Sequence, residues 1–66
     1  MTDLKPSDYG RFDFVLRRKG IVTPFNLCAR VIEIDGKYIL LRDNDDIEYL
    51  PKRTDIKSFD PANSPF

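Results

Sequence analysis

The residue types that most often perform catalysis are scarce in this 66-residue chain. It has no histidine, so the commonest general base near neutral pH is missing. Its one cysteine, Cys28, stands in an apolar segment, where we expect a buried and unreactive thiol. The serines and the three glycines show neither a nucleophile elbow nor a phosphate-binding spacing. We therefore predict no catalytic residues and no enzyme activity.

The acidic stretch at residues 43–46 raises the question of a calcium site. The EF-hand spacing D-x-[DN]-x-[DN]-G is not met, because Ile47 occupies the third ligand position and no glycine follows it. A solvent-exposed hairpin turn accounts for the same residues. One thiol and no histidine also cannot build a zinc site of Cys and His ligands. We expect no metal and no cofactor.

Two groups of basic residues are the candidates for contacts with phosphate. If the chain binds RNA or another single-stranded nucleic acid, these cations would contact the backbone and nearby aromatic rings would stack on bases. In the alternative interpretation the aromatic residues form the core, and the cations protect exposed strand edges. The nucleic-acid-binding candidates are Arg17, Arg18, Lys19, Tyr49, Lys52 and Arg53.

Charge is distributed unevenly along the chain, although the net charge is zero. Residues 1–30 contain six basic and three acidic residues, a net charge of +3. Residues 31–66 contain five basic and eight acidic residues, a net charge of −3. This polarity favours head-to-tail contact between copies or one basic face; scattered solvent-exposed charge is the alternative.

The length and composition indicate one small globular domain at the lower limit of independent folding. With one cysteine there is no internal disulfide, so self-association is the remaining common source of stability. No apolar run approaches the roughly 18 residues of a membrane-spanning helix, and the polar start MTDLKPSDYG does not resemble a secretory signal. We expect a cytoplasmic protein without a membrane contact.

The first twenty residues allow two interpretations. Residues 1–8 read as a polar, loosely held arm. In residues 8–19, the alternation of Phe12, Phe14 and Leu16 favours a strand. A helix would instead use Ser7 as its N-cap and Gly20 as its stop, which gives an α+β fold with a helix packed on an antiparallel meander. We favour the strand.

Residues 21–34 predict one long strand with a bend. Pro24 cannot donate a ladder hydrogen bond and belongs at an edge or a bend. Apolar residues occupy odd positions up to Val31 and even positions from Ile32 onward. A switch of this kind is what a β-bulge produces, and it lets one strand serve two parts of a small barrel.

Asp35-Gly36 is the strongest local signal, because this dipeptide favours a two-residue type I′ hairpin turn. With these two residues at the centre of the turn, Ile34 would lie opposite Lys37. Both faces of the hairpin would then be apolar, so a second layer or a partner must cover one of them. The predicted faces are Val31, Tyr38 and Leu40 on one side, and Ile32, Ile34, Ile39 and Leu41 on the other.

The rest of the chain predicts a turn at 43–46, a short strand at 47–50, a 3-10 turn after Pro51 and a last strand at 56–59. The expected fold is all-β, a small five-stranded barrel over residues 1–61 with a strongly bent second strand and a flexible tail at 62–66. The short last strands leave open edges. The interface candidates are Ile32, Ile34, Ile39, Leu41, Ile56 and Phe59.

The second half of the chain, residues 31–61, resembles the SH3-like barrels and in particular the Sm-like (Hfq-like) proteins. The resemblance rests on an apolar strand, an LL-D hairpin, a short strand, a turn and an I--h-P strand, where h is apolar. Its residues here are Leu40, Leu41, Asp43, Ile56, Phe59 and Pro61. The family's RG or YKH turn is replaced by PKRTD. The resemblance implies a small barrel and, as one possibility, RNA binding.

Two functions follow from these observations. The first is a small non-enzymatic interaction module that acts through protein–protein contacts, as a homo-oligomer or with another protein. The second is an Sm-like module that binds RNA or single-stranded nucleic acid.

Overall fold

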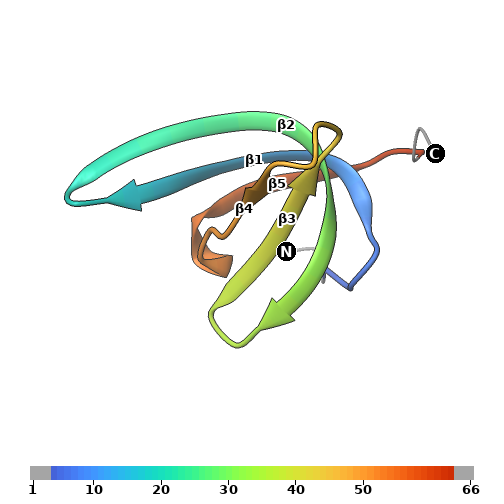
Figure 1. The fold of residues 1–66 in the computed structure, drawn as a ribbon, viewed down its shortest axis with the longest axis horizontal. Helices are drawn as coiled ribbons and strands as arrows, with labels where there is room; N and C mark the ends of the chain where they lie inside the picture. The colour runs from blue at the N-terminus through green and yellow to red at the C-terminus, as the bar shows by residue number, and fades with distance from the viewer. Residues whose placement is uncertain (1–3, 64–66) are drawn as a thin grey trace.

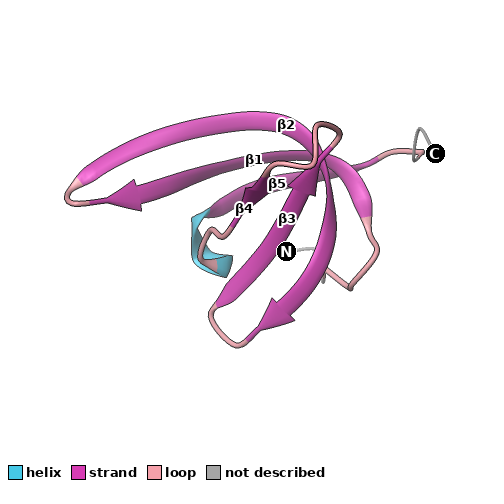
Figure 2. Ribbon diagram, in the orientation of Figure 1, coloured by secondary structure: helices cyan, strands magenta, loops and turns pink. Residues whose placement is uncertain are grey.

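All five strands of residues 4–63 belong to one antiparallel sheet, which is strongly curled (Figures 1 and 2). The computed structural model describes residues 4–63. None of these residues forms a helix long and apolar enough to cross a membrane. The elements are β1 (Tyr9–Arg18), β2 (Ile21–Asp35), β3 (Tyr38–Asp43), β4 (Glu48–Tyr49), the 3-10 helix η1 (Arg53–Asp55) and β5 (Ile56–Pro61).

The strand order in the sheet is β4-β3-β2-β1-β5. The expected all-β fold is therefore confirmed. Each end of this order is an edge, so β4 and β5 do not pair with each other and the sheet is open. The two edge strands come from the last third of the chain.

β1 is a strand over its whole length, which confirms the favoured interpretation and makes the helical alternative for residues 8–19 wrong. It pairs with β2 from Tyr9↔Arg30 to Arg18↔Ile21. Phe12 and Phe14 point to the same side and are fully buried. Their two-residue spacing fits a strand, whereas a helix would separate them by about 200°. Beyond Phe14, residues 15–18 and 21–24 pair only with each other and form a projecting hairpin, here called the arm (Figure 1).

β2 bends where the apolar pattern changes parity. Its register with β3 shifts between Val31 and Glu33, which leaves Ile32 as the bulged residue. The predicted bulge is therefore confirmed at the expected position. It turns the inward face of β2 so that Val31 remains in the core while Ile32 lies on the other side.

The predicted register of the β2–β3 hairpin is wrong. The central turn residues are Gly36 and Lys37, and Asp35 pairs with Tyr38. Gly36 has a φ of +53° and occupies the first central position of the turn, which is the type II′ arrangement. In the predicted type I′ turn, Gly36 would have occupied the second central position. Ile34 consequently lies opposite Ile39 and not opposite Lys37.

The bulge at Ile32 changes the faces, and the burial that results removes two interface candidates. Val31 pairs with Leu41, and both are fully buried together with Ile39. Ile39 and Leu41 therefore belong to the core of this chain and cannot contact a partner. Of the other candidates, Ile34, Ile56 and Phe59 are half-buried against the core, and Ile32 is half-buried on the outer side.

Replacing Gly36 with valine should destabilise the protein by about 1–3 kcal/mol, because a β-branched side chain resists a positive φ. No heavy atom lies near the position of an added Cβ, so the cost is conformational and not steric. Urea denaturation measures it. Gly36→Asn is the control, since asparagine tolerates positive φ best, and it should cost clearly less. Equal stability of the valine variant and the wild type would contradict the turn assignment.

The core is a single cluster between the two halves of the curled sheet. β1, β2 and β3 each contribute alternate side chains to it. On the other face of β1, Val15 is also buried. Cys28 stands next to the buried Ala29, pairs with the exposed Arg11 and is half-buried. The expected burial of the thiol is thus wrong, since Cys28 lies on the outer face. The fully buried cluster is Phe12, Phe14, Ala29, Val31, Ile39 and Leu41.

The segment before β1 is not loosely held within the described residues. The Ser7 N–H donates to the Val31 carbonyl at 2.7 Å, and the Asp8 carbonyl accepts from the Val31 N–H at 2.8 Å. Leu4 also packs against the core. Residues 4–8 are therefore held against the bend of β2, so the prediction of a loosely held segment at residues 1–8 is wrong for these five residues. Residues 1–3 lie outside the described range.

The C-terminal elements differ from the prediction mainly in their ends. β4 has two residues where 47–50 were expected, and β5 continues two residues past the predicted 56–59. The expected 3-10 turn is present as η1. Ala62, the first residue of the predicted tail, donates its N–H to the Tyr9 carbonyl at 3.1 Å. Residues 64–66 lie outside the described range.

Candidate functional site

A hollow lies between the arm and β4; we call it the β4 groove. Its volume is about 440 Å³. Leu16 and Phe25 line it from the arm side, and Tyr49 and Leu50 from the β4 side. Its rim consists of Arg17, Arg18, Thr23 and Glu48.

An aromatic cluster forms the wall of the β4 groove. The rings of Phe14 and Phe25 stack with their centroids 5.3 Å apart. The Tyr49 ring meets Phe14 edge-on at 5.7 Å and Phe25 at 5.3 Å. Phe14 is fully buried, so it anchors the two outer rings and fixes the shape of the groove.

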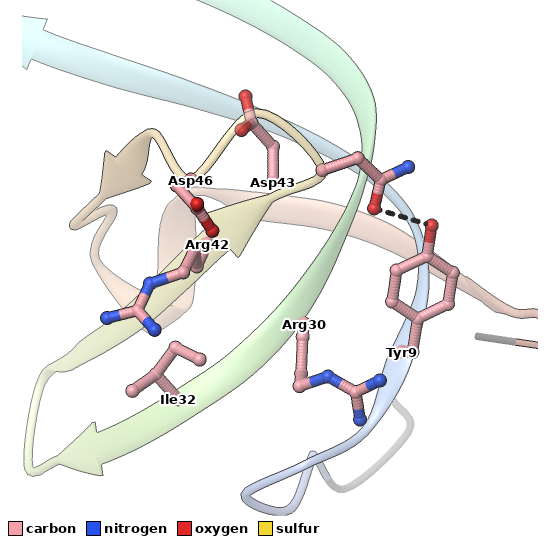
Figure 3. A pocket seen from close by; sticks show the side chains of 7 residues that line it. Tyr9, Arg30, Ile32, Arg42, Asp43 and Asp46 are labelled. Atoms are coloured by element: carbon pink, nitrogen blue, oxygen red, sulfur yellow. Dashed lines mark hydrogen bonds between the residues drawn. The ribbon is translucent and has the colours of Figure 1, made fainter. Parts of the chain in front are cut away.

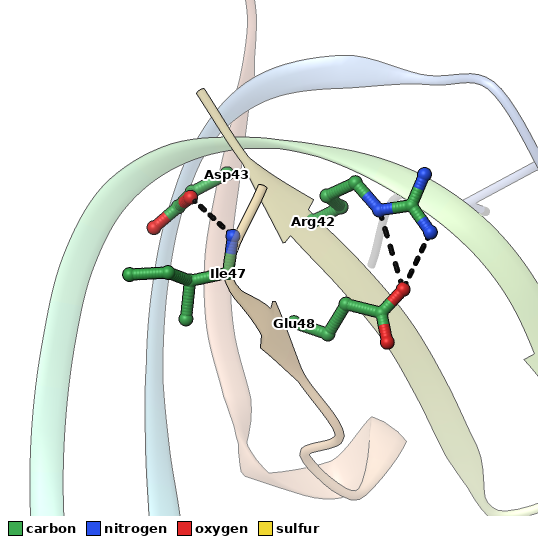
Figure 4. A network of polar contacts seen from close by, with 4 residues as sticks. All are labelled: Arg42, Asp43, Ile47 and Glu48. Carbon is green, nitrogen blue, oxygen red and sulfur yellow. Dashed lines mark hydrogen bonds and ion pairs between the residues drawn. The ribbon is translucent and has the colours of Figure 1, made fainter. Parts of the chain in front are cut away.

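Asp43 organises the turn that leads into β4 (Figure 4). Its Oδ1 accepts hydrogen bonds from the backbone N–H of Asp45 at 2.8 Å and of Ile47 at 2.9 Å. Its Oδ2 accepts from the Tyr49 hydroxyl at 2.9 Å. One carboxylate thus shapes the turn and also holds a groove residue in place. The predicted hairpin turn at 43–46 is confirmed, and its aspartate side chain is occupied by hydrogen bonds of this chain.

These contacts shift two pKa values in opposite directions. Desolvation acts to raise the pKa of Asp43, but the hydrogen bonds from Ile47, Tyr49 and Asp45 outweigh it and lower this pKa below its ordinary value. The hydrogen bond to Asp43, together with desolvation, raises the pKa of Tyr49. The folded state therefore favours an ionised Asp43 beside a protonated Tyr49.

The stabilisation from Asp43 should be present above its ordinary pKa of 3.8 and lost as the pH falls through the lower folded-state value. The stabilisation from Tyr49 should be present below its ordinary pKa of 10.0 and lost as the pH rises through the higher folded-state value.

Asp43→Asn should lower the melting temperature at neutral pH and flatten the decline of the melting temperature in acid. Asp60→Asn is the control. An unchanged acid profile in the Asp43 variant would contradict this role.

Two acidic side chains near the groove, Glu48 and Asp55, form ion pairs with arginines of this chain. On the rim, Nη2 of Arg42 lies 2.5 Å from Oε2 of Glu48 (Figure 4). In η1, Oδ1 of Asp55 lies 3.1 Å from Nε of Arg17. Arg18 at the outer rim forms no ion pair with any residue of 4–63, nor does the adjacent Lys19. The outer end of the groove therefore carries uncompensated positive charge.

The structure brings together some of the predicted nucleic-acid-binding residues. Arg17, Arg18 and Tyr49 line the β4 groove, and Lys52 lines a neighbouring hollow with Arg17. Arg53 lies in η1, outside both hollows. The ring of Tyr49 packs against two phenylalanines and its hydroxyl is hydrogen bonded, so it is part of the wall and not a free stacking platform.

Two exposed apolar side chains continue the groove along the sheet. Tyr38 is 40% exposed and Leu50 is 54% exposed. Both line two smaller hollows, of about 100 and 240 Å³, and Leu50 also lines the β4 groove. Sequence reasoning did not single out Leu50, although Pro51 directly after it marks the end of the edge strand. We call Tyr38 and Leu50 the apolar strip.

The two edges of the sheet differ in how well they are protected. β5 carries a bulge at Lys57, because Ser58 lies opposite Asp13 and Ile56 opposite Phe14, and it ends in Pro61. Bulges, lysines and prolines all hinder pairing with another strand. On the β4 side, Ile47, Tyr49 and Pro51 direct their backbone groups to β3. Glu48 and Leu50 therefore direct theirs away from the sheet.

A second hollow, of about 200 Å³, lies on the outer side of the bend, where Arg30, Ile32 and Arg42 meet the start of β1 and the β3–β4 turn (Figure 3). The Tyr9 hydroxyl donates to Asn44 Oδ1 at 3.0 Å across it. The Arg30 guanidinium lies 5.6 Å from the Tyr9 ring centroid and donates to the Ser7 carbonyl at 3.0 Å. These polar groups serve the fold at the bend.

Among residues 4–63 no three His, Cys, Asp or Glu side chains are arranged to hold a metal ion. The described residues form an apolar groove with a basic end beside an open strand edge. The chain matches no protein-family model, no curated protein and no solved structure.

Proposed function

We propose that this chain is a small non-enzymatic interaction module that acts through protein–protein contacts and associates with copies of itself. The observation that carries this proposal is the convergence of the apolar strip, the β4 groove and the backbone groups of Glu48 and Leu50 on one side of the sheet. Exposed apolar side chains beside an open strand edge are typical of contact surfaces. The lone cysteine further supports a cytoplasmic setting.

We further propose that the curled sheet is a member of the SH3-like barrels. Its strand order, the bulge that bends β2 and the tight turn before β5 support this assignment. In this interpretation β4 and β5 are the two strands between which the barrel stays open, and a partner strand at β4 would extend the sheet.

Sedimentation velocity over a range of concentrations tests the function. We expect association at micromolar concentration, together with a melting temperature that rises with protein concentration. Leu50→Asp should weaken association at least tenfold, because it places a charge in the apolar strip. Ala62→Asp is the matched control: Ala62 is exposed and directly follows β5, the strand at the other edge of the sheet, so this variant should associate like the wild type.

A wild type that stays monomeric at every concentration, with a melting temperature independent of concentration, would contradict self-association. Wild-type behaviour of Leu50→Asp would place the contact surface elsewhere.

One observation favours nucleic acid as a second candidate function. Arg17, Arg18 and Tyr49, three of the six predicted contact residues, line the same groove. Binding of a random single-stranded oligonucleotide should then fall steeply with salt, and Arg18→Ala should reduce the logarithmic salt slope by roughly one. A flat salt dependence would exclude phosphate contacts at this groove.

A further inference from the structure

The outer end of the β4 groove combines positive charge with an exposed apolar side chain. Arg18 and Lys19 have no ion-pair partner in residues 4–63. Ile21 pairs with Arg18 across the arm and is 67% exposed. Because directly paired residues share one face of an antiparallel ladder, Ile21 lies on the same side as Arg18 and Leu16. A ligand for this surface needs negative charge next to an apolar group.

The β3–β4 turn of the same chain has that chemistry. Asp45 and Asp46 are exposed and form no ion pair within residues 4–63, and Ile47 beside them is 52% exposed. The turn is held rigidly by the bonds to Asp43 and by the Asp46 N–H, which donates to the Asp43 carbonyl at 3.1 Å. It needs no ordering before it binds, which lowers the entropic cost of association.

The two surfaces do not meet within one molecule. The arm ends at one extreme of the long axis, whereas the β3–β4 turn lies beyond the middle of the molecule, over the bend of β2 (Figure 1). The length along this axis is 36 Å, and the ten pairs of the β1–β2 ladder, four of them within the arm, hold the arm in its direction. Each surface is therefore available to another copy.

We propose that the β4 groove of one copy receives the β3–β4 turn of a second copy. Ile47 of the incoming turn contacts the apolar lining at Leu16 and Leu50, while its aspartates face Arg18 and Lys19. This inference rests on the proposed self-association and names the surfaces that carry it. It also gives a role to the +3 and −3 halves of a chain whose net charge is zero.

Groove and turn are different surfaces, so the contact is heterologous. Every copy can then offer its turn to one neighbour and its groove to another, which gives rings or open chains larger than a dimer. Nucleic acid fits the groove less well, because the Phe25 and Tyr49 rings contact each other and Phe14. Such a ligand would also leave the exposed Ile47 of the turn unused.

Two oppositely charged variants test the contact by sedimentation velocity at low salt. The turn variant, Asp45→Lys with Asp46→Asn, changes the net charge from zero to +3. The groove variant, Arg18→Glu with Lys19→Asn, changes it to −3. Asparagine is chosen at 46 and 19 because these residues have φ values of +62° and +51°. Circular dichroism and thermal melting verify that each variant is folded.

Each variant alone should lose association at least tenfold, since like charges then face each other. An equimolar mixture should associate like the wild type, because the reversed turn of one variant complements the reversed groove of the other. The control, Lys37→Glu with Lys57→Asn, also has a net charge of −3 but leaves both surfaces intact. Alone it should associate like the wild type. In a mixture, its intact turn can enter the intact groove of the turn variant, but the reversed turn of that variant has no complementary groove, so the turn variant should only end chains and the mixture should stay smaller than the mixture of the two oppositely charged variants.

Three outcomes would overturn this assignment. If the wild type associates and both variants do so equally well, the self-association proposed above stands but its surfaces are others. If the mixture fails to associate, charge pairing between turn and groove is absent. If self-association survives both changes while binding of a random single-stranded oligonucleotide is lost in the groove variant, the groove holds nucleic acid. A monomeric wild type would instead contradict the proposed self-association itself.

Discussion

Replacing Phe14 with alanine should leave a large fraction of the protein unfolded in water. The ring is fully buried, and truncating a buried phenylalanine costs about 3–5 kcal/mol. A chain of this length has a total stability of only about 3–10 kcal/mol, from roughly 0.05–0.15 kcal/mol per residue. Phe14 also anchors Phe25 and Tyr49, so its loss removes the wall of the β4 groove.

Urea denaturation monitored by circular dichroism measures this effect. Ile21→Ala is the control, because the side chain is 67% exposed and its truncation should change the stability by less than about 0.5 kcal/mol. Near-ultraviolet circular dichroism of the three tyrosines offers a second measurement, since the Tyr49 ring should lose its fixed environment and its share of that signal. A Phe14→Ala variant within about 1 kcal/mol of the wild type would mean that the core does not depend on this ring.

The strands of this fold can be predicted from local patterns, because each pattern acts on its own residues. Phe12 and Phe14 alternate, so β1 is recognisable without knowledge of its partners. The change of parity between Val31 and Ile32 likewise locates the bulge, since one extra residue must reverse the faces. These signals are encoded by neighbours in the sequence and need no information on the tertiary structure.

The errors arise where two local solutions compete. Asp35-Gly36 fits a type I′ turn, but here Gly36 takes the first central position of the turn. This displacement moves each partner by two residues and leaves the faces unchanged, but the bulge at Ile32 places Val31 opposite Leu41. The apolar pattern did not show which of the two faces is buried, and Ile39 and Leu41 were assigned to a contact surface for that reason. The burial of Cys28 was also predicted wrongly. Its neighbours in the sequence are apolar, but it pairs with Arg11 across the ladder and therefore shares the outward face of that residue.

The candidate site is less predictable than the fold, because it is assembled from segments far apart in the sequence. Leu16 and Leu50 come from β1 and from the end of β4, and only the curl of the sheet places them around one hollow. The charges nearby were visible in the sequence, but their pairing was not. Arg17 is neutralised by Asp55, 38 residues later, whereas its neighbour Arg18 has no such partner in residues 4–63.

Replacing Gly10 with alanine should detach β5 from β1. A Cβ at this position would overlap the Asp60 carbonyl oxygen and lie 2.6 Å from Cε1 of Phe59. The carbonyl belongs to the ladder, where Gly10 pairs with Pro61 and Arg11 with Asp60, so it cannot retreat without breaking strand pairing. Overpacking of this kind costs about 1–3 kcal/mol, and a clash with backbone belongs at the upper end.

The double variant Gly10→Ala with Phe59→Leu separates the two obstacles. Shortening Phe59 removes the ring contact but leaves the carbonyl in place, so it should restore little of the stability measured in urea. Faster hydrogen exchange of the β1 and β5 amides, with the β2–β3 hairpin still protected, would locate the damage at this edge. Full recovery in the double variant would show that the ring alone opposes a side chain at position 10. Because β5 is bound through β1 only and covers Phe12 with Phe59 at a centroid distance of 4.7 Å, its release should also expose the core.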